Sequence, residues 1–182
     1  MAKNIFSGLK DAKINADANY ERAGHYLQLI NRCKTGTSRK GKDFAVVEKT
    51  CVHVFDDKDG LGHRVGEDLS WMLMVDNDYF QGDLCKFIGA VMGISPEEVE
   101  DEHGPLIFEA EDDKSGHDQP FAGLVVECKN MEIQKKNSDG VFTKIKHVRQ
   151  VPASELLETL APEVIDRYFP NDVLKSMAEQ EG

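Results

Sequence analysis

Three segments in the first half of the chain combine alternating or dense apolar residues with the valines and aromatics that favour β-strands. These segments are residues 25–33, 44–55 and 64–75. In the first segment, Leu27, Leu29 and Cys33 are expected on one face and Tyr26 on the other. The glycine- and lysine-rich residues 35–42 predict an antiparallel hairpin between the first two strands.

A helix is predicted after the third strand, because apolar residues across Phe80–Val91 recur at spacings of three and four. Gly93 stands where such a helix ends, and residues 76–78 offer capping side chains before it. Ser95–Glu102 begins with a capping box and predicts a short acidic helix. Residues 103–120 are expected to form a loop.

The second half of the chain predicts two more strands, residues 121–131 and 141–151, and then a helical end. Ser154 and Asn171 are expected helix caps, and Pro162 suits a first helical turn. The predicted apolar stripe of this helical end is Leu156, Leu157, Leu160, Val164, Ile165, Phe169, Leu174 and Met177. If this long apolar stripe is exposed, the protein could form a homo-oligomer through it.

The element order predicts a mainly β fold with helices, of the α+β class. Three strands, a helix and two strands follow one another as in an OB-fold, a five-stranded, partly open barrel with its helix between strands 3 and 4. We expect an irregular segment at residues 1–23, an OB-fold-like domain at 24–151 with an acidic insertion at 95–118, and a helical extension at 152–182. OB-folds bind oligonucleotides with the loops joining strands 1–2 and 4–5, and both loops are basic here.

The net charge of −11 is distributed unevenly along the chain. Residues 1–55 carry +5 and residues 119–150 carry +3, whereas residues 56–118 carry −14 and residues 151–182 carry −5. If the fold brings the two basic segments together, they form a surface for a polyanion. The alternative is a solvated surface on which charges cluster by chance.

No membrane span or secretion signal is expected. The longest apolar run, Phe87–Ile94, is far shorter than a span of roughly 18 residues, and residues 1–10 lack the apolar stretch of a signal peptide. The cysteines, which form no CxxC pair, suit buried thiols in a reducing compartment. They are Cys33, Cys51, Cys85 and Cys128. We expect a cytoplasmic protein.

One segment resembles a phosphate-binding P-loop without completing it. Residues 36–42 match its first seven positions, but Asp43 stands where Ser or Thr would bind magnesium, and the chain continues into a strand rather than a helix. The histidines form no metal-ligand spacing. We therefore expect no cofactor, no metal and no catalytic residue.

Binding of single-stranded DNA needs cations for the phosphates and aromatic rings for the bases. Phe142, Lys144 and Lys146 are expected on one face of the fifth strand, and Tyr26 with Arg32 and Lys34 repeats this arrangement on the first. The candidate nucleic-acid-binding residues are Tyr26, Arg32, Lys34, Arg39, Lys40, Lys42, Trp71, Lys129, Lys135, Lys136, Phe142, Lys144, Lys146 and Arg149.

Four segments of the chain resemble the single-stranded DNA-binding proteins that bacteriophages encode for replication and recombination. They are CKTGTSRKGKDFAVVE, FQGDLCKFIGAVMG, VVECKN and VFTKIKHVRQV, and the resemblance covers roughly residues 24–150. It implies an OB-fold core, DNA binding without sequence preference or catalysis, the cytoplasm of a bacterial host, and replication or recombination proteins as partners. An acidic carboxyl terminus that recruits such partners is also implied, and residues 176–182 are mildly acidic without a terminal aromatic.

Two alternatives remain. Glu127 and Lys129 have the spacing of the PD-(D/E)xK nucleases, with Asp118 upstream as a further metal carboxylate. Carboxylate oxygens would hold a hard divalent cation, and Lys129 would orient the attacking water. The other alternative is a protein-interaction module that uses the acidic insertion and the terminal helices.

Overall fold

The computed structural model describes residues 21–109, 119–136 and 138–181. The expected irregular segment lies mostly outside these residues, as does part of the acidic insertion. The strands are β1 (Gly24–Thr37), β2 (Asp43–Asp56), β3 (Asp68–Met74), β4 (Val125–Gln134) and β5 (Val141–Gln150). The helices are α1 (Phe80–Met92), the 3-10 turn η1 (Pro96–Glu98), α2 (His103–Phe108), α3 (Ala153–Thr159), α4 (Pro162–Tyr168) and α5 (Val173–Glu181).

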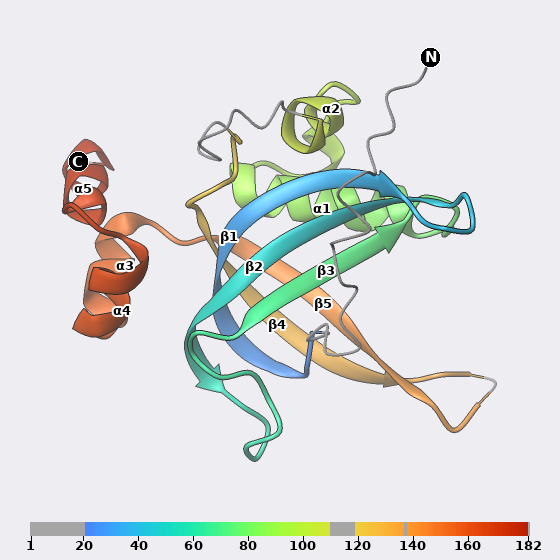
Figure 1. The fold of residues 1–182 in the computed structure, drawn as a ribbon, viewed down its shortest axis with the longest axis horizontal. Helices are drawn as coiled ribbons and strands as arrows, with labels where there is room; N and C mark the ends of the chain where they lie inside the picture. Colours follow the sequence, from blue (N-terminus) through green and yellow to red (C-terminus); the bar gives the residue numbers. More distant parts are fainter. Residues whose placement is uncertain (1–20, 110–118, 137, 182) are drawn as a thin grey trace.

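The five strands form one antiparallel sheet in the order β3-β2-β1-β4-β5 (Figure 1). β1 is therefore the middle strand, paired with β2 on one side and with β4 on the other. The predicted α+β class is confirmed. The predicted OB-fold-like barrel is not confirmed, because within the described residues β3 and β5 are the two edges of an open sheet and do not pair with each other.

A bulge in β1 overturns the expected grouping of its side chains. Asn31 has no cross-strand partner in β2, since the register steps from Ile30 to Arg32. One extra residue turns every later side chain to the other face. Leu27 and Leu29 consequently belong to one buried cluster, whereas Cys33 joins Ile30 in another.

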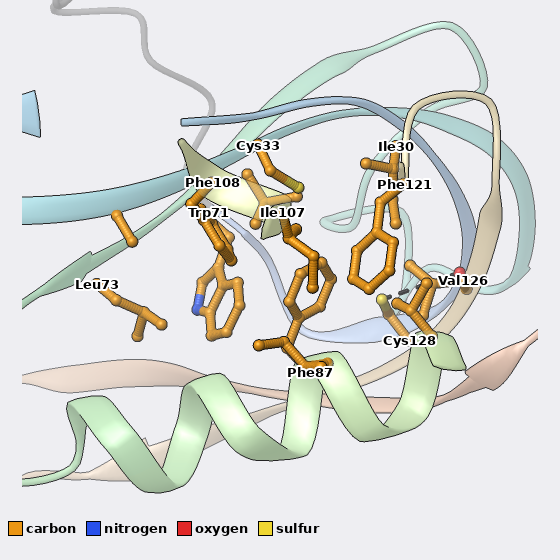
Figure 2. Close-up of a cluster of buried hydrophobic side chains, with 14 residues drawn as sticks. Ile30, Cys33, Trp71, Leu73, Phe87, Ile107, Phe108, Phe121, Val126 and Cys128 are labelled. Carbon is orange, nitrogen blue, oxygen red and sulfur yellow. Dashed lines mark hydrogen bonds between the residues drawn. The ribbon is translucent and has the colours of Figure 1, made fainter. Parts of the chain in front are cut away.

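The cluster that contains Cys33 fills the space between the sheet and the helices α1 and α2. The Phe87 ring, fully buried on α1, lies at its centre (Figure 2). Its centroid is 5.4 Å from that of Trp71 on β3, 5.8 Å from Phe121 and 6.3 Å from Phe108 on α2. Residues 103–108 are thus a helix that completes the core, where the sequence predicted a loop.

α1 confirms the periodicity argument, and Gly93 ends it in the left-handed conformation with φ 71°. The capping box is present too, with the Ser95 N–H donating to Glu98 Oε2 at 2.9 Å. It starts only the 3-10 turn η1, because the backbone becomes extended at Val99. No helix in the described parts of the chain is long and apolar enough to cross a membrane.

Two strands begin later than predicted because turns precede them. β3 starts at Asp68, after a turn in which the Glu67 N–H donates to the Arg64 carbonyl at 3.1 Å. β4 starts at Val125, after the Leu124 N–H donates to the Phe121 carbonyl at 3.2 Å. Both turns contain apolar residues that are typical of strands, so the sequence alone placed the strand starts too early.

The apolar stripe of the terminal helices packs against this chain's own sheet. Its residues share a buried cluster with Leu27, Leu29, Val52 and Val125. Pro162 opens α4 as predicted, while the N-cap of α3 is Pro152 rather than Ser154. Because the sheet covers the stripe, it no longer argues for an oligomer.

Candidate nucleic-acid interface

One face of the β4–β5 hairpin gathers three lysines. Lys129 lies directly opposite Lys146, Met131 opposite Lys144, and Ile133 opposite Phe142. Cross-strand partners share a face of the sheet, so these six residues form one surface, which we call the lysine face. Lys129 is 53% exposed and Phe142 is 46% exposed. The expected grouping of Phe142, Lys144 and Lys146 on one face is consistent with this register.

The lysine face carries little compensating negative charge. Lys129 has a carboxylate oxygen of Glu127 at 3.8 Å, and among the described residues Lys144 and Lys146 have no acidic partner within 4 Å. Like charges directly opposite each other destabilise a sheet. The pairing of Lys129 with Lys146 therefore adds nothing to the stability of the hairpin, and it favours an anionic ligand.

Arg149 extends the same surface but is held by acids of its own chain. Its guanidinium donates to both oxygens of Glu155, at 2.8 and 2.6 Å, and to Glu127 at 3.0 Å. The bonds to Glu155 are the main cause of the raised pKa of Arg149. Glu127 also lies 2.8 Å from His25. Arg149 thus joins α3 to the sheet, a role that no sequence pattern signalled.

The two basic hairpin tips lie at one end of the long axis, opposite the C-terminal helices (Figure 1). Arg39 and Lys40 are exposed on the β1–β2 tip, as are Lys135 and Lys136 beside the β4–β5 turn. The other predicted cations of this region face acids. Lys42 pairs with Asp76 at 2.6 Å, Lys34 pairs with Glu48, and Arg32 faces Glu48 across the strands.

The structure places Tyr26 inside the protein and not on the interface. Tyr26 is fully buried; its hydroxyl donates to the Ala23 carbonyl at 2.5 Å and accepts from the His63 N–H at 3.3 Å. Before the bulge, the even-numbered side chains of β1 point into the interior. A ring so enclosed has no face left for a nucleobase.

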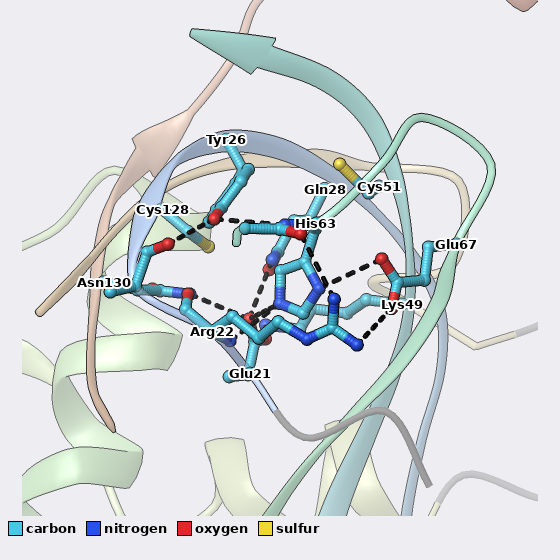
Figure 3. A network of polar contacts seen from close by, with 12 residues as sticks. Glu21, Arg22, Tyr26, Gln28, Lys49, Cys51, His63, Glu67, Cys128 and Asn130 are labelled. Carbon is cyan, nitrogen blue, oxygen red and sulfur yellow. Dashed lines mark hydrogen bonds and ion pairs between the residues drawn. The ribbon is translucent and has the colours of Figure 1, made fainter. Parts of the chain in front are cut away.

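Tyr26 borders a buried polar network that the sequence did not reveal (Figure 3). Glu21 forms an ion pair with Lys49, and it accepts hydrogen bonds from Gln28 at 2.9 Å and from Asn130 at 2.8 Å. Burial alone would raise the pKa of Glu21, but the Lys49 ammonium and the side-chain contacts with His63 and Gln28 hold it well below its usual range. The network anchors the start of the described chain between β1, β2 and β4.

A groove of about 590 Å³ separates the two edges of the open sheet. We call it the edge groove. β3 contributes Trp71 to its wall, β5 contributes Phe142 and Lys144, and Tyr79 stands just before α1. Tyr79 is 74% exposed, whereas Trp71 is 8% exposed because it packs on Phe87 and His147. The sequence did not single out Tyr79, which lies between a strand and a helix.

Of the alternative nuclease site, the structure describes Glu127 and Lys129. Both carboxylate oxygens of Glu127 are already engaged, by His25 and by Arg149. Asp118 lies outside the residues that the structure describes. Within residues 21–109, 119–136 and 138–181, no group of three or more His, Cys, Asp or Glu side chains is arranged to hold a metal ion.

Three of the four cysteines are buried, namely Cys33, Cys51 and Cys128. Burial raises the pKa of each thiol to about 12. Since the thiolate is the reactive form, these groups are inert at neutral pH. Cys85 on α1 is half-buried.

No protein-family model matches this sequence, and no curated protein is significantly similar to it. The class that the structure defines is a mixed α+β protein built on an open five-stranded antiparallel sheet.

Proposed function

We propose that this protein binds single-stranded DNA with little sequence preference and without catalysis. The observation that carries the proposal is the lysine face, where Lys129, Lys144 and Lys146 lie beside the exposed ring of Phe142. Lysines neutralise phosphates and release counterions, and an exposed ring stacks on any base. A protein of this kind would act on the single-stranded intermediates of replication and recombination, as the resemblance to bacteriophage proteins implies.

The strand order supports the same proposal. The order β3-β2-β1-β4-β5 is compatible with an OB-fold whose barrel is open between β3 and β5. In that fold the loops joining strands 1–2 and 4–5 contact the oligonucleotide. Here those two loops expose Arg39, Lys40, Lys135 and Lys136 toward one end of the molecule (Figure 1).

Lysines on an edge strand have another common role, which is to deter pairing with other chains. That role suits Lys144 and Lys146, because β5 is an edge strand. It does not account for Lys129, because β4 is paired on both sides. The cluster across the two strands therefore favours ligand binding over edge protection.

Charge reversal tests the proposal. The variant Lys144→Glu/Lys146→Glu is compared with Lys58→Glu/Lys175→Glu, which changes the net charge equally at exposed positions outside the lysine face, the two basic hairpin tips and the lining of the edge groove. Fluorescence anisotropy with a labelled oligothymidine is measured between low and moderate salt, with duplex DNA for comparison and one series containing magnesium.

We expect the wild-type protein to bind the single strand in a salt-dependent manner and to leave it uncut. The lysine-face variant should bind at least tenfold more weakly. Its slope of log affinity against log salt should fall by about 1.4, or roughly 0.7 for each phosphate that the variant no longer neutralises. Unchanged affinity in that variant, an equal loss in the control, or magnesium-dependent cleavage would each contradict the proposal.

A further inference from the structure

We infer that the edge groove binds the nucleobases of the DNA strand whose phosphates lie on the lysine face. This inference rests on the proposed function and assigns it a second surface, which adjoins the lysine face. The groove lies between β3 and β5, and its volume of about 590 Å³ falls within the range of roughly 300–1,000 Å³ typical of small-ligand sites.

Aromatic rings line the edge groove from three elements. Tyr79 precedes α1, Trp71 belongs to β3, and Phe142 belongs to β5. Tyr79 and Phe142 are large exposed rings, and Met72 on β3 is a further exposed apolar side chain in the wall. Exposed rings beside cations are the arrangement on which unpaired bases stack.

Two residues connect the edge groove with the lysine face. Phe142 and Lys144 belong to both, because β5 is the edge strand around which the two surfaces meet. Side chains on one face of a strand recur about every 6.7 Å, so Lys144 and Lys146 can contact neighbouring phosphates. A DNA strand whose phosphates contact these lysines has its bases beside the edge groove.

The charges of the groove separate bases from phosphates. Glu21 and Asp83 line it, and each is paired with a lysine of its own chain, Lys49 and Lys86 respectively. Because both carboxylates are paired, the lining holds little net charge and suits uncharged bases better than phosphates. The neutral polar side chains of Ser70, Asn77 and Thr143 add hydrogen-bonding groups to the same walls. Of the three lysines of the lysine face, Lys144 lines the groove, whereas Lys129 and Lys146 lie outside it.

Among the described residues β3 and β5 each have one edge without a partner strand, and a strand from another protein could add to the sheet there. The exposed Tyr79 ring and the adjoining lysines favour a nucleic acid, since a β-strand needs neither. The test must therefore respond to bases and not only to occupancy of the groove.

Trp71 makes the test direct, because it is the single tryptophan of the chain and lines the groove. The full-length protein is titrated with oligothymidine and with an abasic oligonucleotide of the same length while tryptophan emission is recorded. We expect oligothymidine to change the emission strongly and the abasic strand to leave it almost unchanged while still binding in anisotropy. Equal changes with both strands would overturn the inference.

The variants Tyr79→Leu and Phe142→Leu remove exposed rings of the groove, and Phe55→Leu removes a similarly exposed ring that does not line it. Each groove variant should bind oligothymidine roughly tenfold more weakly, with an unchanged salt slope, and the control should bind almost as well as wild type.

The outcomes separate the two claims. Phe142 belongs to both surfaces, so Tyr79→Leu is the variant that separates the two claims. Salt-dependent binding that is unaffected by Tyr79→Leu, with unchanged Trp71 emission, overturns the inference and leaves the proposed function standing; a partner strand then becomes the better occupant. Absence of binding at low salt overturns both claims.

Discussion

The buried ion pair between Glu21 and Lys49 predicts a large and asymmetric response to mutation. The side chains are 3% and 0% exposed, so neither charge is stabilised by water. Replacing Lys49 with Met leaves a buried carboxylate without its counter-ion, and replacing Glu21 with Gln leaves a buried ammonium. Breaking a buried pair in this way costs about 3–5 kcal/mol of the free energy of unfolding.

That decrease should lower the melting temperature by roughly 6–20 °C, at about 2–4 °C per kcal/mol for a chain of this length. The double variant Glu21→Gln/Lys49→Met leaves no buried charge at either position. Because Gln28 and Asn130 can still donate to the Gln oxygen, we expect it to be less destabilised than either single variant.

Urea unfolding followed by circular dichroism measures all four proteins at pH 7. A pH series adds a check on the sign of the effect. The folded-state pKa of Glu21 lies below its unfolded value, so its contribution is present above an unfolded pKa of about 4.3 and disappears as the pH falls. The gap between wild type and Glu21→Gln should therefore narrow in acid. Single variants within about 1 kcal/mol of wild type, or additive effects in the double variant, would refute the reasoning.

Two further predictions concern packing. At pH 8 a thiol reagent should modify Cys85 readily in the folded protein, and the three buried cysteines only after unfolding by urea. Mass spectrometry of the modified peptides measures the rate at each cysteine, and equally fast reaction at all four would contradict the prediction. Gly24→Ala should be destabilised by about 2–4 kcal/mol, because φ is +146° and the new Cβ would overlap the Tyr26 hydroxyl and lie 2.5 Å from the Asp56 carbonyl oxygen. Gly82→Ala on α1 meets open space and should be neutral or slightly stabilising in the same urea measurement.

The elements that could be predicted are those whose pattern is local. α1 is evident from its apolar spacing and Gly93, and β5 from alternation. α2 is not, because Gly104 and Pro105 weaken any helical signal and its stability comes from burying Ile107 and Phe108 in the core. The bulge at Asn31 is equally invisible, since it depends on how β2 and β4 pair with β1.

In the candidate interface, too, local features could be predicted from the sequence, whereas features that depend on distant contacts could not. Alternation was enough to group Phe142 with Lys144 and Lys146, but only the register brings Lys129 opposite Lys146. Whether a cation is free depends on distant acids, as Arg149 shows by its bonds to Glu155. Sequence position also gave no hint that Tyr79 lines a groove.

The central position of β1 has a consequence for how the chain folds. β1 can pair with β2 as soon as the hairpin is complete, but its other edge has to wait for β4. His25 contacts Glu127, 102 residues further on, and Glu21 contacts Asn130 across 109 residues. Closing such long loops precedes any gain from the contacts, so sheets of this kind fold in milliseconds to seconds rather than microseconds. On the ribosome the β1–β2–β3 meander therefore emerges first, and the second edge of β1 stays without its partner until β4 has been synthesised.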